Sequence, residues 1–451
     1  MNINHLSMRQ WLLALMVASS VSLAGQPASD TIAEPKNELS VDLQLLARGE
    51  TRYGGMTPET TEETEEEEGK VAKSHFIMGR TRLVINYKRD WLEARVTPQH
   101  SGIWGQAGKG SLNLYETWAK LTTRFGLFVQ LGRVALSYDD ERIIGSDDWA
   151  MASQSHDVLR VGYEGHGHKA HLIFAYNQNA EVLDGNTYYV GGGQPYKTMQ
   201  DLWYHYDFQK FPLGVSVLFM NIGMQNMDNE NVKHTTHFQQ LLGGYLSFRP
   251  KRWNVEASYY HQMGKNETSM KIDAWMASGK VEFSPKPTYG FVGGFDYLSG
   301  DKYFAVPPKG GIGVIRHDVI RGFSTVYGSH HKFYGAMDFF YVSTYLNGFT
   351  PGLQNAYIGG FYCPIPGLKI DASYHNLSTA TKLRDIDMFL GHEFEFQTSY
   401  AITRDVGVML GAALMSGSKT MERLKRNSGN NTLRWGWIGL SVNPRIFTTK
   451  W

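Results

Sequence analysis

The chain has 451 residues and a formal net charge of +1, with 44 Lys and Arg against 43 Asp and Glu. This balance excludes the strongly basic surface of a nucleic-acid-binding protein, and a single cysteine, Cys363, excludes an internal disulfide and a metal site built from cysteines. After the first 25 residues no apolar run approaches the roughly 20 residues of a membrane-spanning helix, which excludes a helical membrane protein.

The first 24 residues are predicted to be a signal peptide. Arg9 precedes the apolar stretch Trp11–Val21, and Ser22-Leu23-Ala24 has the small-x-small pattern of a cleavage site. The mature chain would then start near Gly25 with a short periplasmic segment, residues 25–38. An N-terminal anchor helix is the alternative, but the apolar stretch is too short for it.

From residue 39 onward, short segments alternate apolar and polar side chains. The first, residues 39–47, places Val41, Leu43 and Leu45 on one face and Asp42 and Gln44 on the other. Such alternation is typical of a strand with one apolar face. About eighteen such segments follow one another to the C-terminus, among them residues 77–87, 92–97 and 158–163.

The connections between these segments alternate strictly between long and short. Short ones cover residues 88–90, 122–126, 164–169, 209–214, 249–252, 284–289, 364–367 and 402–406, whereas the long ones include residues 136–155, 177–200, 298–352 and 416–432. Outer-membrane barrels have tight periplasmic turns and long external loops. The sequence therefore predicts an all-β fold, a transmembrane antiparallel β-barrel of about 18 strands over residues 39–451, in a bacterial outer membrane.

A barrel of this kind has an apolar lipid face and a polar lumen. Ten charged side chains fall on the predicted inner face: Arg80, Arg82, Glu93, Arg95, Glu116, Lys120, Arg160, Asp296, Glu393 and Glu395. The four arginines form a candidate ladder that would favour anions. Alternatively, these arginines pair with neighbouring glutamates (Glu93, Glu116 and Glu164) and only brace the wall.

Two segments resemble motifs of the alginate-export family of outer-membrane porins. The first is Gly132-Arg133-x-x-Leu136-Ser137-Tyr138-Asp139-Asp140-Glu141-Arg142-Ile143-Ile144-Gly145, followed by Trp149 and Asp157-Val158-x-Arg160; the second is Tyr327-Gly328-Ser329-His330-His331-Lys332-Phe333-Tyr334-Gly335-x-Met337-Asp338. Their charged members are Arg133, Asp140, Glu141, Arg142, His331, Lys332 and Asp338. The resemblance implies a pore with a basic lumen for a polyuronate such as alginate, whereas the predicted lumen here carries charges of both signs.

The orientation of Arg133 depends on its strand. If Leu127, Val129 and Leu131 face lipid, strict alternation also turns Arg133 outward, whereas a β-bulge would turn it into the lumen. The acidic residues between Asp139 and Asp148 could bind Ca²⁺, but Arg142 in their midst favours a network of ion pairs.

The longest connection, residues 298–352, exceeds the about 12–15 residues above which a loop without secondary structure usually has a role. We expect it to fold inward and narrow the lumen, with His331, Lys332 and Asp338 bonded to wall residues. An external flap or an extra hairpin is the alternative.

The predicted function is a channel that passes an anionic polysaccharide or other acidic solutes by diffusion through a charged lumen. The alternative is a general diffusion porin, or a structural surface barrel with a plugged lumen. No Gly-x-Ser-x-Gly or His-Glu-x-x-His motif is present, so no enzyme is predicted. We expect no cofactor and no metal. The expected partners are outer-membrane lipid, lipopolysaccharide and the barrel-assembly machinery, with an anionic polysaccharide as a further candidate and no nucleic acid.

Overall fold

The structure is a computed structural model that describes residues 37–54, 73–106, 109–177, 196–225, 235–301, 319–338, 350–382, 386–425 and 432–451. The predicted signal peptide and nearly all of the segment 25–38 lie outside the described residues. So do residues 302–318 and 339–349 of the long loop.

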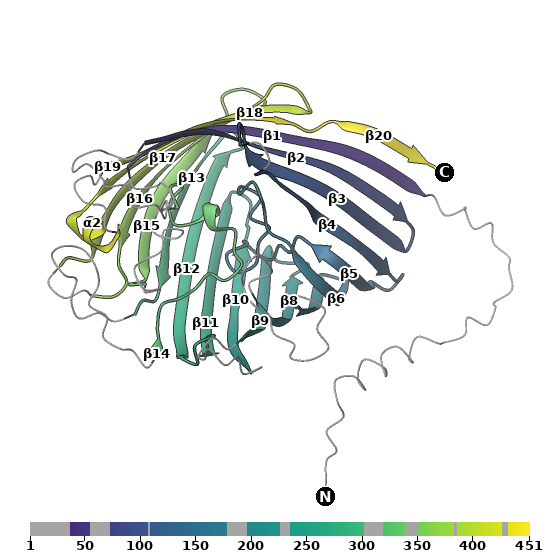
Figure 1. Ribbon diagram of the computed structural model, residues 1–451, viewed down its shortest axis with the longest axis horizontal. Helices are drawn as coiled ribbons and strands as arrows, with labels where there is room; N and C mark the ends of the chain where they lie inside the picture. The colour runs from purple at the N-terminus through teal and green to yellow at the C-terminus, as the bar shows by residue number, and fades with distance from the viewer. Residues whose placement is uncertain are drawn as a thin grey trace, which may run out of the picture. The chain divides into compact units, whose positions relative to one another are not determined.

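Within the described residues, eighteen strands form one closed antiparallel sheet (Figure 1). They are β1 (Glu38–Tyr53), β2 (Lys73–Arg89), β3 (Leu92–Ile103), β4 (Ser111–Thr122), β5 (Leu127–Val134), β6 (His156–Gly165), β7 (His168–Tyr176), β8 (Thr198–Asp207), β9 (Leu213–Gln225), β10 (Thr236–Phe248), β11 (Trp253–Lys265), β12 (Lys271–Lys286), β13 (Tyr289–Leu298), β15 (Leu353–Tyr362), β16 (Leu368–Ser378), β17 (Phe389–Ala401), β18 (Val406–Gly417) and β19 (Thr432–Val442). Each pairs with the next along the chain. The predicted all-β antiparallel barrel of about 18 strands is confirmed.

The barrel closes where its first strand meets its last. β1 pairs with β19 from Leu45↔Val442 to Tyr53↔Arg434, and with β20 (Arg445–Lys450) from Glu38↔Lys450 to Asp42↔Arg445. β20 continues the direction of β19 beyond Pro444, so the two together act as the eighteenth strand. Closure leaves no sheet edge in lipid, where an unpaired backbone group would have no partner.

Three small elements were not predicted. β14 (Val319–Ile320) forms a short parallel pairing with the first two residues of β12. The 3-10 helix η1 (His330–Lys332) lies within the long loop. The helix α2 (Lys419–Lys425) forms in the connection predicted as a plain loop, and its Met421 and Leu424 are buried. No helix in the described part of the chain is long and apolar enough to cross a membrane.

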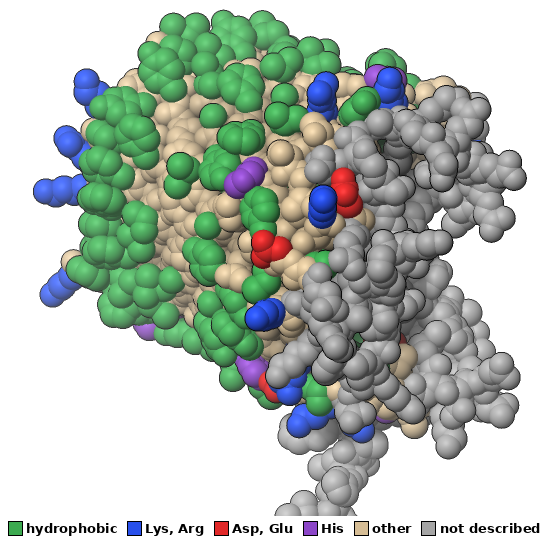
Figure 2. Space-filling model, turned by 90° about the vertical axis from the view of Figure 1, so that its left-hand side faces the viewer, with side chains coloured by type: hydrophobic (Ala, Val, Ile, Leu, Met, Phe, Trp, Pro, Cys, Tyr) green, Lys and Arg blue, Asp and Glu red, His purple; other side chains and the backbone are tan. Residues whose placement is uncertain are grey.

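The outer face of the barrel is apolar. Leu127, Val129 and Leu131 of β5 are exposed while Phe128 and Gln130 between them are buried, and the same alternation continues around the sheet. Figure 2 shows one side of this surface, on which many hydrophobic side chains stand out between stretches of backbone and other side chains. These side chains provide the surface that lipid requires.

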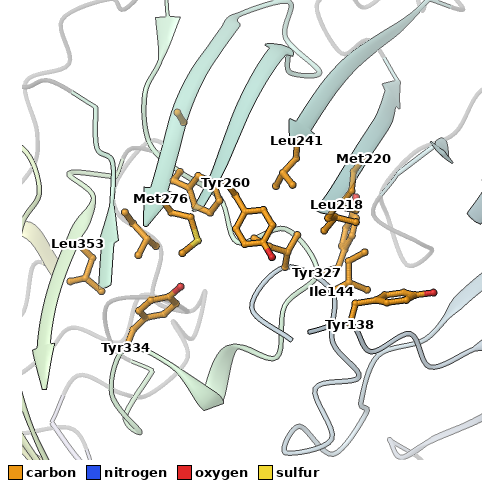
Figure 3. Packing of buried hydrophobic residues seen from close by; sticks show 14 of the residues in the cluster. Tyr138, Ile144, Leu218, Met220, Leu241, Tyr260, Met276, Tyr327, Tyr334 and Leu353 are labelled. Atoms are coloured by element: carbon orange, nitrogen blue, oxygen red, sulfur yellow. The ribbon is translucent and has the colours of Figure 1, made fainter. Parts of the chain in front are cut away.

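Part of the inner face departs from the prediction of a polar lumen. Apolar side chains that point inward from the walls, such as Leu218, Met220 and Leu241, are completely or almost completely buried. They pack against Tyr138, Ile144 and other residues of two loops that lie inside the barrel (Figure 3). The reason is visible in β9, whose sequence Leu213–Gln225 is apolar on both faces, as expected for a strand that is covered on both sides.

A glycine provides a test of the register between β4 and β5. Gly132 in β5 has φ +129°, and a Cβ atom at this position would lie 2.1 Å from the carbonyl oxygen of Thr117 on β4. We predict that Gly132→Ala lowers the free energy of unfolding by about 1–3 kcal/mol, measured by urea titration of the purified barrel in detergent. The matched control is Gly279→Ala, since nothing lies within 4 Å of its Cβ position. Equal stability of the two variants would contradict the assigned β4–β5 register.

Candidate functional site

Two loops form the site by meeting inside the barrel. One covers residues 135–155, between β5 and β6, and the other is the described part of the long loop, residues 319–338. Gly145 donates its N–H to the carbonyl of Tyr327 at 2.8 Å, and Tyr327 donates to Ile143 at 3.0 Å. A parallel bridge joins Ile144 to Tyr327. The inward folding predicted for the long loop is confirmed for these residues.

Arg142 holds the two loops to the wall. Its guanidinium is buried and pairs with Asp140 of its own loop at 3.1 Å and with Asp296 of β13 at 3.1 Å. It also donates to the Tyr334 hydroxyl at 3.0 Å and lies over the Phe333 ring at 4.0 Å. Burial alone would lower the pKa of Arg142, but Tyr334 and the two carboxylates raise it well above its usual value. The cation is therefore permanent.

Two carboxylates of β17 fix the tip of the long loop. Ala336 donates its backbone N–H to Glu395 at 2.6 Å, and Met337 donates to Glu393 at 2.8 Å. Gly335, with φ +97°, allows this approach, because a Cβ atom there would lie 2.4 Å from a Glu393 oxygen. Glu393 and Glu395 therefore hold a loop as well as face the lumen.

The expected wall contacts of His331, Lys332 and Asp338 are wrong in detail. His331 and Asp338 bond to each other, with 2.8 Å between Nδ1 and Oδ2, and Lys332 donates to Glu141 of the other loop at 2.5 Å. The ring of His331 stacks on Trp149, with 4.0 Å between centroids. The hydrogen bonds of these side chains join loop to loop, while the backbone of the motif bonds to the wall; the ring of His331 also lies edge-on to Trp435 of β19, with 5.6 Å between centroids.

Glu141 and His330 are among the loop residues with displaced pKa values. Burial would raise the pKa of Glu141, but hydrogen bonds from Lys332, Ser137 and Ser329 outweigh it and lower the pKa. Burial lowers the pKa of His330 to about 4. At neutral pH Glu141 is therefore ionised and His330 is neutral.

The candidate arginine ladder is engaged in contacts. Arg80 and Arg82 of β2 both reach Asp148, at 3.2 and 2.8 Å, and both donate to the Ser153 hydroxyl. Arg82 also donates to Gln99 of β3 at 2.6 Å. These arginines therefore dock the loop 135–155 onto the wall, rather than pairing with the glutamates that the sequence suggested.

The remaining predicted inner residues each contact another side chain of the wall or of the inward loop. Arg95 pairs with Glu116 at 3.0 Å, and Arg160 donates to the Tyr138 hydroxyl at 3.2 Å. The other contacts are Lys120–Glu164 at 3.7 Å and Glu93–Lys88 at 3.1 Å. For Arg95 the bracing alternative holds, whereas Arg160 forms no ion pair in the part of the chain that the structure describes.

Arg133 does not face the lumen. The β5–β6 register runs without a bulge from Leu127↔Tyr163 to Val134↔His156, so Arg133 shares the outer face with Leu131. There it forms a two-pronged ion pair with Asp157, with both nitrogen–oxygen distances at 2.7 Å. This motif residue therefore lies on the outer face of the barrel.

Sequence reasoning missed a cluster at the end of β1. Glu50 accepts from Arg48 and from Arg52, each at 2.8 Å, and Arg48 lies 3.8 Å over the Trp149 ring. The sequence pattern could have revealed this cluster, because Arg48, Glu50 and Arg52 continue the series of even-numbered, inward-facing residues that begins at Asp42. The predicted end of the strand at Ala47 cut the pattern short.

A cavity of about 800 Å³ remains in the lumen beside these loops. Its charged lining residues are balanced: five are basic (Arg48, Arg80, Arg142, Lys280 and Lys332) and five are acidic (Asp140, Asp148, Glu256, Asp296 and Glu395). Among the residues that the structure describes, no group of three or more His, Cys, Asp or Glu side chains could hold a metal ion. The loop from Asp139 to Asp148 forms ion pairs instead.

Comparisons with known proteins add to this geometry. No protein-family model matches the chain, and no curated protein matches it in sequence. Solved structures do match. OpdL of Pseudomonas aeruginosa has a TM-score of 0.59 at 12% identity, covering 91% of this chain and 99% of that one. OccAB1 of Acinetobacter baumannii has a TM-score of 0.59 at 10% identity, and the match covers 91% of this chain and 97% of that one. A BenF-like porin from Pseudomonas fluorescens Pf-5 has a TM-score of 0.59 at 12% identity, and the match covers 90% of this chain and 99% of that one.

These matches establish the fold at the level of class. The chain has the fold of a bacterial outer-membrane porin, and its apolar outer face places it in that membrane. The matches do not support the resemblance to the alginate-export family; they support the coarser prediction of a barrel with the fold of outer-membrane porins.

Arg142 offers a direct test of the loop anchoring. Arg142→Met keeps the volume but leaves Asp140 and Asp296 without their cation, which costs the docked state about 3–5 kcal/mol. We predict a folded barrel whose single-channel conductance is larger and noisier than that of the parent, measured in planar bilayers. Arg133→Met, on the outer face of the barrel, is the control, and this variant should conduct like the parent. A quiet, unchanged conductance of Arg142→Met would mean that this ion pair does not hold the loops.

Proposed function

We propose that the protein is a diffusion channel for small polar solutes, narrowed by its two inward loops. The observation that carries this proposal is the cavity of about 800 Å³ with its balanced charged lining. A lining of charged side chains suits a water-filled passage, because hydrated polar solutes and ions exchange contacts along such a surface. The porin fold supports the same conclusion at the level of class.

The balance of charge argues for weak ion selectivity. Rings of one sign select ions of the opposite sign, but here each cation near the cavity has a carboxylate close by. Arg48 pairs with Glu50, Arg142 with Asp140 and Asp296, and Lys280 with Glu256 at 2.6 Å. This pairing favours the general-porin alternative over a channel dedicated to anions.

Passage of an anionic polysaccharide has less support. A polyuronate needs a succession of free cations that it can exchange along its length. Arg80 and Arg82 already share Asp148, and Arg95 is paired with Glu116. The motif resemblance remains the only ground for such a substrate, and polymer block of the channel would test it.

We predict discrete channels in planar bilayers, with a reversal potential near zero in a KCl gradient, and entry of small sugars but not polymers in liposome swelling. Arg80→Glu combined with Arg82→Glu should move the reversal potential toward cation preference, because two cations near the cavity become anions. The control is Lys73→Glu with Arg434→Glu, two residues that flank Tyr53 on the outer face.

The outcomes separate the candidates. An absence of conductance from a folded barrel would favour a structural barrel with a plugged lumen. Strong anion selectivity together with block by a polyuronate would favour the polysaccharide channel, and either result would overturn the proposal.

A further inference from the structure

Three consecutive periplasmic turns carry exposed cations. Lys210 lies in the β8–β9 turn, Lys251 and Arg252 lie in the β10–β11 turn, and Lys286 ends β12 at the next turn; all four side chains are exposed. In the described structure none of the four forms an ion pair. The nearby carboxylate of Asp207 is occupied by His205 at 2.9 Å and Lys169 at 3.6 Å. We name these four residues the cationic turn patch.

Elsewhere on the periplasmic rim, many cations are neutralised. Lys88 pairs with Glu93, Lys369 with Asp371, Arg445 with Asp42 and Lys450 with Glu38, at 2.6–3.2 Å. Arg89, Arg124 and Arg404 also form no ion pair in the described structure, but they lie on three other turns, away from the patch. Figure 2 shows Lys and Arg side chains projecting beyond the apolar surface along one edge of the molecule. Positive charge without a protein partner is therefore concentrated on the three turns from β8 to β13.

A band of aromatic pairs borders the same turns. Tyr206 packs on Phe208, and Phe211 on Phe248, with centroids 4.7 and 5.0 Å apart. Next to them Trp253 packs on Phe283 at 4.4 Å. Phe208, Phe211 and Trp253 are each at least 43% exposed. Exposed aromatics of a barrel lie at the level of the lipid headgroups.

The patch therefore lies within reach of the headgroups. Phe211 follows Lys210 directly, and Trp253 follows Arg252, so these two exposed rings are each adjacent in sequence to a cation. Long basic side chains extend from the apolar surface to the headgroup region. Lys251 has φ +49°, a conformation that favours Gly or Asn, so the turn geometry itself gives no reason for a lysine there.

We propose that the cationic turn patch binds the phosphate-bearing headgroups of anionic phospholipids in the periplasmic leaflet. Basic residues near a membrane surface attract anionic lipid, and clustered ones bind individual headgroups. The inference rests on the barrel fold and on the charges of the turns, and it does not depend on which solute the channel passes.

The test compares two variants with equal charge loss. Lys210→Gln, Lys251→Gln, Arg252→Gln and Lys286→Gln together remove the patch. The matched control removes four paired cations of the same rim through Lys88→Gln, Lys369→Gln, Arg445→Gln and Lys450→Gln. Each full-length barrel is checked for folding by its heat-modifiable gel mobility. Native mass spectrometry then measures retained phosphatidylglycerol against phosphatidylcholine.

The parent and the control should retain phosphatidylglycerol in preference to phosphatidylcholine, and the patch variant should bind phosphatidylglycerol at least about tenfold more weakly. Added salt should weaken binding in the parent, because screening acts on exposed charges. Equal retention by patch and control variants would overturn the proposal. So would equal retention of the two lipids by the parent, or full displacement of lipid by inorganic phosphate, which would indicate a site for free phosphate. The proposal would likewise be contradicted if the patch variant lost a bound acidic protein and retained phosphatidylglycerol as the parent does.

Discussion

The structure depends on one constraint: lipid offers no hydrogen-bond partner, so every backbone N–H and C=O in the membrane must be satisfied within the sheet. β1 meets this constraint by pairing with β2 on one side and with β19 and β20 on the other. Closure with eighteen strands also fixes the width of the barrel, and a barrel of this size is too wide for its wall side chains to fill. The space inside must be occupied by water or by other parts of the chain.

In this protein the inward loops fill part of that space, and a cavity of about 800 Å³ remains beside them. Its inward loops bury an apolar cluster against the walls, and that burial supplies the non-directional part of the attachment. The directional part comes from buried ionic contacts, above all Arg142 with Asp140 and Asp296. Buried ion pairs add little net stability, but breaking one is costly, so such a pair favours one position of a loop over others. The loops are therefore held in a defined place, and the cavity beside them keeps a defined lining.

The periodicity of the chain predicts the barrel because a two-residue repeat and the alternation of loop lengths are local properties. The outward facing of Arg133 also follows from strict alternation once the strand is known to be free of a bulge. The partners of the wall arginines could not be predicted in this way. Arg82 and Asp148 are 66 residues apart, and only the inward folding of a loop brings them together. Likewise, the inner apolar face of β9 has a local signal, but the cover it packs against comes from distant loops.

The position of the long loop is the central claim, and hydrogen–deuterium exchange of the full-length protein in lipid nanodiscs tests it most directly. The backbone amides of Ala336 and Met337 donate to Glu395 and Glu393 inside the barrel. Buried and bonded amides exchange only when the structure opens. The account predicts that a peptide covering residues 335–338 exchanges nearly as slowly as the strands. Exchange within seconds, at the rate of a free surface loop, would contradict it.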